Sequence, residues 1–384
     1  MSFSELRDEP DELRPEIGLC LSGGGYRAMV FHVGALWRLN EAGLLRKIRR
    51  ISSVSGGSIT AAYLGLLWNE LNFDGAGRAR SYDKVVEGIR RMASTSIDAG
   101  AILGGIFLPG TISDRVARAY AKTLFGEATL QDLPDDGDGQ TPRFVINATN
   151  VQSAVLWRFS RPYMGDYRVG LIRNPTVSLA TAVAASSAFP PMLSPLELDI
   201  DAAFEPDDKA DLTGPEFRRR VMLSDGGVYD NLGLETVFKS YETVLVSDAG
   251  QKVAPEPDPA TDWARHAVRI LDVVDNQVRS LRKRALIAAY LSKARTGTYW
   301  GIRTHFADYK LQDDPLGCAG RDPTPLAEVP TRLSAMDDAT QEKLVNWGYA
   351  VTDAALRRHF DADLQARFGV VIGAPEGFPY PGGY

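Results

Sequence analysis

Two turns near the start of the chain carry residue types that could perform acyl transfer. One of them, SVSGG over residues 53–57, places Ser55 between small residues on both sides. A serine hydroxyl is a weak nucleophile until a base takes its proton, and a sharp strand-to-helix turn lifts such a serine clear of the backbone. We therefore predict that Ser55 is a nucleophile and that Gly57 relieves crowding in its turn. A glycine turn in which serine is merely small fits the same residues.

The other turn, GGGYR over residues 23–27, could supply the donors that a reacting carbonyl needs. Consecutive glycines bring bare backbone N–H groups close to a developing negative charge, so we predict an oxyanion hole at Gly23, Gly24 and Gly25. Arg27 either adds positive potential or pins the loop. The segment also satisfies a dinucleotide-binding pattern, but the next strand ends in serines where such a site needs an acidic residue.

The base that the serine requires is expected far downstream, at Asp225. This residue ends an apolar run over residues 221–225, and Gly226 and Gly227 after it predict a tight turn. In open α/β sheets, sites are built at the carboxyl ends of the strands. Asp-Gly is also a common turn pair in which the carboxylate binds its own backbone, so both interpretations stay open at this stage.

These segments, together with ASSAFPP over residues 185–191, occur in the order found in patatin-like lipid acyl hydrolases, and residues 17–250 resemble that family. The resemblance implies a three-layer α/β/α sandwich around a mainly parallel central sheet. It also implies a catalytic dyad of Ser55 and Asp225, oxyanion donors near Gly24 and Gly25, and a phospholipid or other acyl ester as substrate.

Two positions depart from the family pattern. Ser53 stands where the family usually has glycine, and Ala28 stands where many members have glycine. Neither change removes a reacting group. In the implied mechanism, Asp225 takes the proton of Ser55 during formation of an acyl-enzyme and then activates water. An unperturbed aspartate has a pKa of about 3.9, so burial must raise the pKa of Asp225 for it to act as a base.

Two other functions stay open. The order Ser55, Asp225, His305 permits the triad of an α/β-hydrolase, because His305 follows a strand-like run over residues 299–304. The patatin pattern fits the glycine turns better, and His32 is expected to be a packed core residue. The same fold could also bind lipid or a partner without turnover, since fold does not fix function.

Composition limits the partners of the chain. Its 384 residues are 44% hydrophobic and carry a net charge of −6, which gives no general attraction to nucleic acid. The two cysteines do not form a disulfide framework. The acidic residues over 199–220 do not have the spacing of a calcium loop, so we expect neither a metal nor a cofactor.

The chain is expected to divide into a catalytic core over residues 16–252 and a mostly helical extension over 253–384 packed on that core. No apolar run is long enough to span a bilayer, and no secretory signal is visible, so we expect a cytoplasmic protein that contacts membranes peripherally. The apolar segment 101–109 either dips into a lipid interface or packs on the core. A basic cluster over residues 279–284 either attracts acidic headgroups or forms a salt-bridged helix face.

Periodicity and turn residues place the remaining elements. We predict strands over residues 143–150, 155–160 and 243–248 and near residue 302. We predict helices over residues 58–68, 176–185, 262–294 and 339–360.

Overall fold

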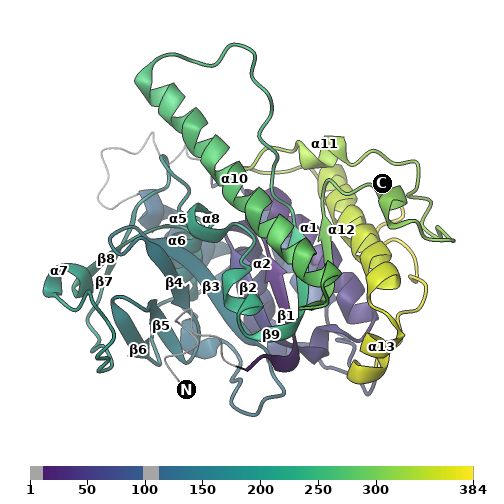
Figure 1. Ribbon diagram of the computed structural model, residues 1–384, viewed down its shortest axis with the longest axis horizontal. Coiled ribbons are helices and arrows are strands. Elements are labelled where there is room, and N and C mark those ends of the chain that lie inside the picture. Colours follow the sequence, from purple (N-terminus) through teal and green to yellow (C-terminus); the bar gives the residue numbers. More distant parts are fainter. Residues whose placement is uncertain (1–11, 98–111, 384) are drawn as a thin grey trace.

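The computed structural model of the chain describes residues 12–97 and 112–383. Within those residues, a ten-stranded mixed sheet has the order β10-β9-β1-β2-β3-β4-β5-β6, with β8 paired to β3 and β7 paired to β8 (Figure 1). The strands are β1 (Arg14–Leu21), β2 (Ile48–Val54), β3 (Arg143–Asn150), β4 (Val155–Phe159), β5 (Tyr163–Asp166), β6 (Gly170–Arg173), β7 (Leu196–Asp199), β8 (Arg220–Asp225), β9 (Tyr241–Asp248) and β10 (Thr296–Gly301).

The strands from β10 to β3 form the parallel part of the sheet, and β4 to β8 join it in antiparallel pairs. Residues 17–21 of β1 are buried without interruption, as expected for a strand covered on both faces. A helix follows β1 and another follows β2, which gives the crossovers that parallel neighbours require.

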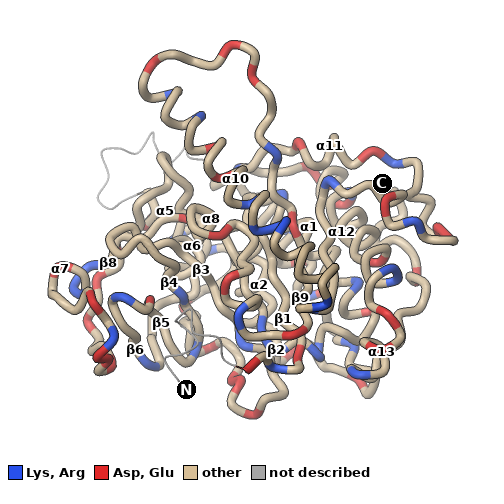
Figure 2. The backbone as a smooth tube through the Cα atoms, in the orientation of Figure 1, with Lys and Arg blue, Asp and Glu red and all other residues tan. Residues whose placement is uncertain are grey.

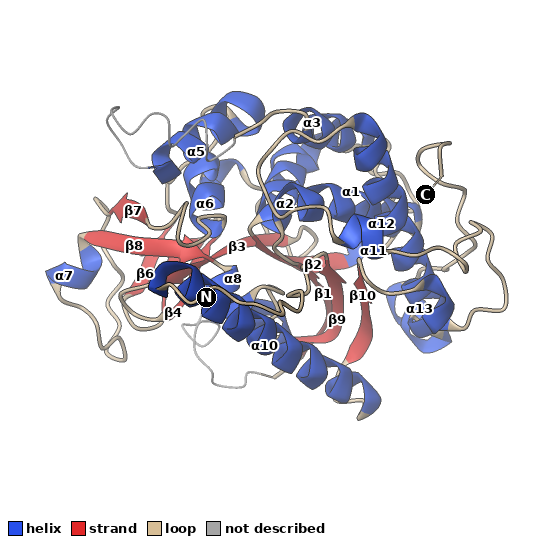
Figure 3. Ribbon diagram, turned by 90° about the horizontal axis from the view of Figure 1, so that it is seen from above, coloured by secondary structure: helices blue, strands red, loops and turns tan. Residues whose placement is uncertain are grey.

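Helices cover both faces of the sheet (Figure 3). The helices α1, α2, α3, α6 and α12 lie on one face, and α10 lies on the other. The predicted three-layer α/β/α sandwich is confirmed. The helices are α1 (Gly25–Glu41), α2 (Gly56–Leu67), α3 (Asp83–Ala93), α5 (Ile112–Tyr120), α6 (Leu179–Ser186), α7 (Pro215–Arg218), α8 (Gly227–Asp230), α9 (Glu235–Phe238), α10 (Trp263–Leu291), α11 (Thr324–Ala327), α12 (Asp338–His359) and α13 (Ala362–Phe368).

Each face of the sheet has its own apolar core. The larger core joins the sheet to α1, α2, α6 and α12. The smaller core lies under α9 and α10, where Val237 and Leu286 pack with Cys20 and Val244 of the sheet. Both cysteines of the chain are free and buried.

The region beyond residue 252 is built into the same sheet. β10 pairs with β9, and α12 crosses α1 closely, because a Cβ on Gly34 would lie 1.8 Å from the Val345 carbonyl oxygen. The pairing of β10 with β9 and the contact between α1 and α12 join the two predicted parts of the chain. The division into a core and an extension at residue 252 stays a prediction.

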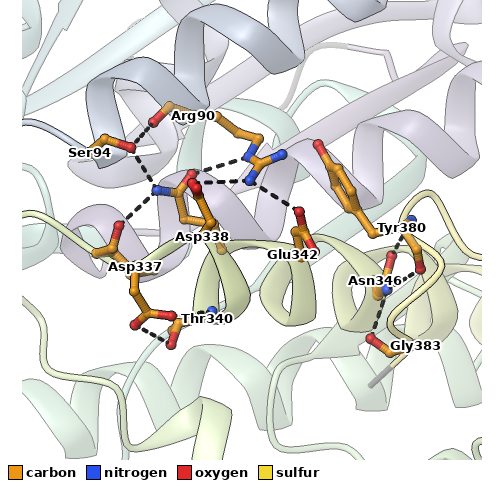
Figure 4. A network of polar contacts seen from close by, with 11 residues as sticks. Arg90, Ser94, Asp337, Asp338, Thr340, Glu342, Asn346, Tyr380 and Gly383 are labelled. Carbon is orange, nitrogen blue, oxygen red and sulfur yellow. Dashed lines mark hydrogen bonds and ion pairs between the residues drawn. The ribbon is translucent and has the colours of Figure 1, made fainter.

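Polar contacts hold the C-terminal segment against α3 and α12 (Figure 4). Arg90 of α3 forms ion pairs with Asp338 and Glu342 of α12, and its guanidinium lies 4.7 Å from the centre of the Tyr380 ring. The Asn346 side chain binds the backbone of Tyr380 and the carbonyl of Gly383. These contacts fix the last residues over the α3–α12 junction.

The predicted elements lie close to the observed ones. β3 has the predicted bounds, and α10 covers most of the long helix predicted over residues 262–294. The strand predicted near residue 302 ends at Gly301. No described helix combines the length and the apolarity that crossing a bilayer requires. The segment 101–109, with its predicted lipid or core contact, lies outside the described residues.

Candidate active site

Ser55 occupies the predicted turn between β2 and α2. Its backbone φ of 51° and ψ of −122° lie in a region that non-glycine residues rarely adopt, at a cost of about 1–3 kcal/mol. The turn is tight on its other side, since a Cβ on Gly56 would lie 2.0 Å from the Gly25 carbonyl oxygen. A Cβ on Gly57 would lie 2.5 Å from the carbonyl oxygen of Leu21. Only glycine fits at these two positions.

A series of hydrogen-bonded serine hydroxyls supports the Ser55 turn. The Ser55 backbone N–H donates to Ser186 Oγ at 2.9 Å, and Ser186 Oγ lies 2.9 Å from Ser58 Oγ. Ser58 in turn donates to Ser53 Oγ at 3.0 Å, and Ser53 donates to the Val145 carbonyl at 3.3 Å. Ser53 therefore fits where the family usually has glycine, because its hydroxyl is buried with partners on both sides.

β3 brings Ser55 and Asp225 together. The last residue of β2, Val54, is opposite Asn147 of β3, and Asp225 at the end of β8 is opposite the next residue, Ala148. β2 runs parallel to β3 and β8 runs antiparallel to it, so β2 and β8 meet end to end along one side of β3. Asp225 is the last residue of its strand, as expected from the sequence, although β8 runs antiparallel to β3.

The Ser55 side chain lies beside the Asp225 carboxylate, close enough for its hydroxyl to lower the pKa of that carboxyl as a donor does. The Gly227 backbone N–H also donates to Asp225 Oδ1, at 2.7 Å. Both side chains are buried, with exposed fractions of 8% for Ser55 and 3% for Asp225. The structure thus joins the two predicted catalytic residues, which are far apart in the sequence.

Burial raises the pKa of Asp225 to about 7. The Gly227 N–H and the Ser55 hydroxyl oppose the rise, and the negative charge of Asp275 on α10 adds to it. Asp225 can therefore take up and release a proton near neutral pH, as a general base requires.

The glycine loop lies directly against this turn. A Cβ on Gly23 would lie 3.1 Å from Ser55 Cβ, and Gly24 and Gly25 have φ values of 143° and 58° that favour glycine. The Gly23 N–H donates to the Asn231 carbonyl at 3.0 Å. Within the described chain, no acceptor is found for the N–H groups of Gly24 and Gly25, so these two amides remain available to a ligand.

A family model described as patatin-like phospholipase matches residues 19–238, which is more than half of the chain and includes the loop, Ser55 and Asp225. The chain belongs to the patatin-like phospholipase family. No curated protein sequence matches it.

Two solved structures show the same fold as this family member. Human GIVD cytosolic phospholipase A2 in complex with methyl gamma-linolenyl fluorophosphonate has a TM-score of 0.52 at 16% identity, over 95% of this chain and 61% of that one. Another structure of human GIVD cytosolic phospholipase A2 has a TM-score of 0.50 at 14% identity, over 96% of this chain and 60% of that one. The patatin-like chain thus spans about three-fifths of the length of these structures.

Arg27 pins the glycine loop in this patatin-like fold. Its buried guanidinium donates from Nε and Nη2 to the Ala249 carbonyl, at 3.1 and 2.9 Å, and from Nη1 to the Val329 carbonyl. Burial lowers the pKa of Arg27 to about 10. Of the two roles considered from the sequence, these contacts favour the structural one.

The histidines lie apart from the dyad. His305 is exposed and follows β10, which β9 and β1 separate from β2 by about 14 Å at the usual strand spacing. His32 is buried, with its ring nitrogens bound to Ser247 Oγ and the Ser22 carbonyl, and burial lowers its pKa to about 4. The alternative triad through His305 is therefore not assembled.

Sequence reasoning did not identify two residues that shape the site. Ser186 lies in the segment 185–191, which carries part of the family resemblance, but no sequence pattern predicts its hydrogen bond to the Ser55 amide. No sequence pattern marks Asn231 as part of the site. Its Oδ1 atom lies 2.3 Å from where a Cβ on Gly23 would be and 2.8 Å from where a Cβ on Gly227 would be. Asn231 therefore fills the space between the loop and the Asp225 turn.

The site is built from serine, aspartate and backbone amides. Among the described residues, no group of three or more His, Cys, Asp or Glu side chains is placed to hold a metal ion.

Proposed function

We propose that the chain is a serine lipid acyl hydrolase of the phospholipase A type, which cleaves fatty-acyl esters through the Ser55–Asp225 dyad. The meeting of these two side chains beside β3 is the observation on which the proposal rests. Membership of the patatin-like phospholipase family supports a lipid ester as the substrate.

In the first step, the Ser55 oxygen attacks the ester carbonyl carbon while Asp225 accepts the hydroxyl proton. The carbonyl oxygen takes the electron pair and becomes an oxyanion. Collapse of this tetrahedral intermediate re-forms the carbonyl and breaks the bond to the leaving alcohol, which takes the proton back from Asp225. The products of this step are an acyl-enzyme on Ser55 and a free lysolipid alcohol.

In the second step, water replaces the alcohol. Asp225 takes a proton from the water as its oxygen attacks the acyl carbon. The new tetrahedral intermediate then expels the Ser55 oxygen, which recovers the proton, and the fatty acid is released. A pKa of about 7 suits both steps, because Asp225 must be ionised to accept each proton and must then give it back.

Gly24 and Gly25 are the proposed oxyanion donors, because their N–H groups are available and their loop contacts the Ser55 turn. Gly23 and Arg27 hold that loop through their own hydrogen bonds. The strained backbone of Ser55 and the serine chain beneath it keep the nucleophile in place before the substrate arrives. Removal of one such oxyanion donor typically lowers kcat by about 10²–10³-fold.

We infer a cytoplasmic enzyme that meets its substrate at the surface of lipid aggregates. The dyad does not determine the leaving group, the position of the cleaved ester or the length of the acyl chain. These depend on the surfaces around it.

Hydrolysis of mixed phospholipids by three proteins tests the proposal. Wild type should release fatty acid and lysophospholipid, and Ser55→Ala should lose at least about 10³-fold in rate. Ser292→Ala is the matched control, because it removes an exposed hydroxyl after α10, and it should retain full activity. Equal rates for wild type and Ser55→Ala would contradict the mechanism, and no hydrolysis by any of them would favour a silent lipid-binding module.

A further inference from the structure

α10 exposes an unusual amount of apolar surface. Among the described residues, nine of the fifteen exposed large apolar side chains belong to this one helix. Its N-terminal half projects beyond the body of the molecule (Figure 1). The nine exposed side chains are Trp263, Val268, Ile270, Leu271, Val273, Val274, Leu281, Ile287 and Leu291.

Three of the four basic residues over 279–284 face the protein, together with the apolar Leu286, while Arg284 is exposed. Arg282 forms ion pairs with Glu235 at 2.7 Å and Asp230 at 3.6 Å, and the Lys283 ammonium lies 4.1 Å from the centre of the Tyr299 ring. Arg279 donates to the Gln251 carbonyl. For Arg279, Arg282 and Lys283 these contacts favour the salt-bridged face over the headgroup-binding cluster considered from the sequence, and they fix which side of α10 faces outward. Figure 2 shows the basic residues along the part of α10 that crosses the body.

The shape of the apolar surface indicates what covers it. At 3.6 residues per turn, eight of the nine side chains span an arc of about 200°, and Val268 widens it on the projecting turns. A partner helix in a coiled coil covers only a narrow seam of such a surface. A lipid surface covers a broad arc, its headgroup layer accommodates the exposed His266 and Arg284 that lie within this arc, and a tryptophan at the tip is suited to the boundary between acyl chains and headgroups.

The position of α10 connects this surface to the dyad. Asp275, midway along α10, is near enough to Asp225 for its charge to raise the pKa of that carboxyl. α8, which begins two residues after Asp225, packs against α10 and exposes Val228. The body-facing side of α10 therefore lies close to the dyad.

We propose that the outward face of α10 inserts into the surface of a phospholipid bilayer and anchors the enzyme there. The choice of a lipid surface as the partner rests on the proposed function. The body-facing ion pairs set the orientation, and the projecting turns from Trp263 to Val274 enter the lipid.

The fluorescence of Trp263 provides a direct test. It is the one exposed tryptophan among the six in the described chain, with an exposed fraction of 86%. Vesicles of brominated phosphatidylcholine should quench this residue in the Ser55→Ala protein, in which no substrate is consumed. The signal should be absent from Trp263→Phe in the same background. Absence of vesicle-dependent quenching in the Ser55→Ala protein would overturn the proposal.

A triple substitution separates docking from catalysis. Ile270→Ser, Leu271→Ser and Val274→Ser together should weaken binding to phosphatidylcholine vesicles by about 100-fold and slow hydrolysis of vesicle lipid, because each removes a buried apolar contact with the bilayer. Hydrolysis of a soluble short-chain ester should be retained. Val371→Ser is the matched control, because it changes an apolar side chain that is 81% exposed on the segment after α13, and it should bind vesicles like wild type.

The outcomes also distinguish the two proposals. If wild type hydrolyses neither substrate while brominated lipid still quenches Trp263, the proposed function fails and docking stands. If wild type hydrolyses both substrates and the triple variant hydrolyses vesicle lipid equally well, docking fails and the function stands. If sedimentation velocity shows a dimer that the triple variant converts to monomers, without vesicle binding by wild type, α10 contacts a second copy and the proposal is overturned.

Discussion

Replacement of Asp225 by asparagine should stabilise the fold at alkaline pH while abolishing activity. Burial raises the pKa of this carboxyl from its ordinary 3.8 to about 7, so the folded protein favours the neutral form. The stability that wild type gains from the neutral carboxyl is complete below pH 3.8 and is lost as the pH rises through about 7. An asparagine has no proton to lose and keeps an oxygen for the Gly227 N–H.

The magnitude follows from the pH range that the transition covers. Between about pH 5 and pH 8, wild type loses about 2.7 kcal/mol of unfolding free energy relative to Asp225→Asn, at 1.36 kcal/mol for each pH unit from pH 5 to the pKa of about 7. The difference then stays constant to about pH 9. Denaturant unfolding of both proteins across this range measures it directly.

Asp208→Asn serves as the control, since it removes an exposed carboxylate, and its difference from wild type should not change over the same range. A pH-independent difference for Asp225→Asn would refute the assignment of Asp225 as a buried carboxyl with a raised pKa.

Three further predictions concern the geometry of the site. The kcat/KM for a soluble ester should rise with pH through an inflection at about 7, because only ionised Asp225 accepts the proton, and an inflection near the ordinary pKa of aspartate would contradict this. Ser186→Ala should lower the free energy of unfolding by about 1–3 kcal/mol, measured by denaturant titration, because it leaves the buried Ser55 amide without an acceptor. Gly23→Ala should destabilise by about 1–3 kcal/mol in the same assay and slow ester hydrolysis, because its Cβ would overlap Asn231 Oδ1, and wild-type behaviour would disprove that contact.

Much of the architecture could be predicted from local patterns. The apolar residues 144–146 of β3 and the glycines around Ser55 carry their structural consequences within a few residues, so the strand and the turn lie where they were expected. The family resemblance supplied what local patterns could not, namely that a serine and an aspartate so far apart in the chain belong to one site.

Other features depend on contacts between distant segments. The direction of β8 is set by its pairing with β3, so the apolar run that ends at Asp225 could not reveal that it meets β2 end to end. α10 exposes apolar residues on its outward side, while Leu286 packs inward beside Arg282, whose partners Asp230 and Glu235 come from another segment. The periodicity of the sequence predicted the helix α10, but only the fold shows which side of that helix is buried.

Labelling with a fluorophosphonate ester, followed by peptide mapping, tests the dyad most directly. We expect a single adduct on Ser55, no adduct in Ser55→Ala, and much slower labelling of Asp225→Asn, because Asp225 takes the proton of the attacking hydroxyl. An adduct on another residue, or labelling of Asp225→Asn at the rate of wild type, would contradict the central claim that these two side chains act together.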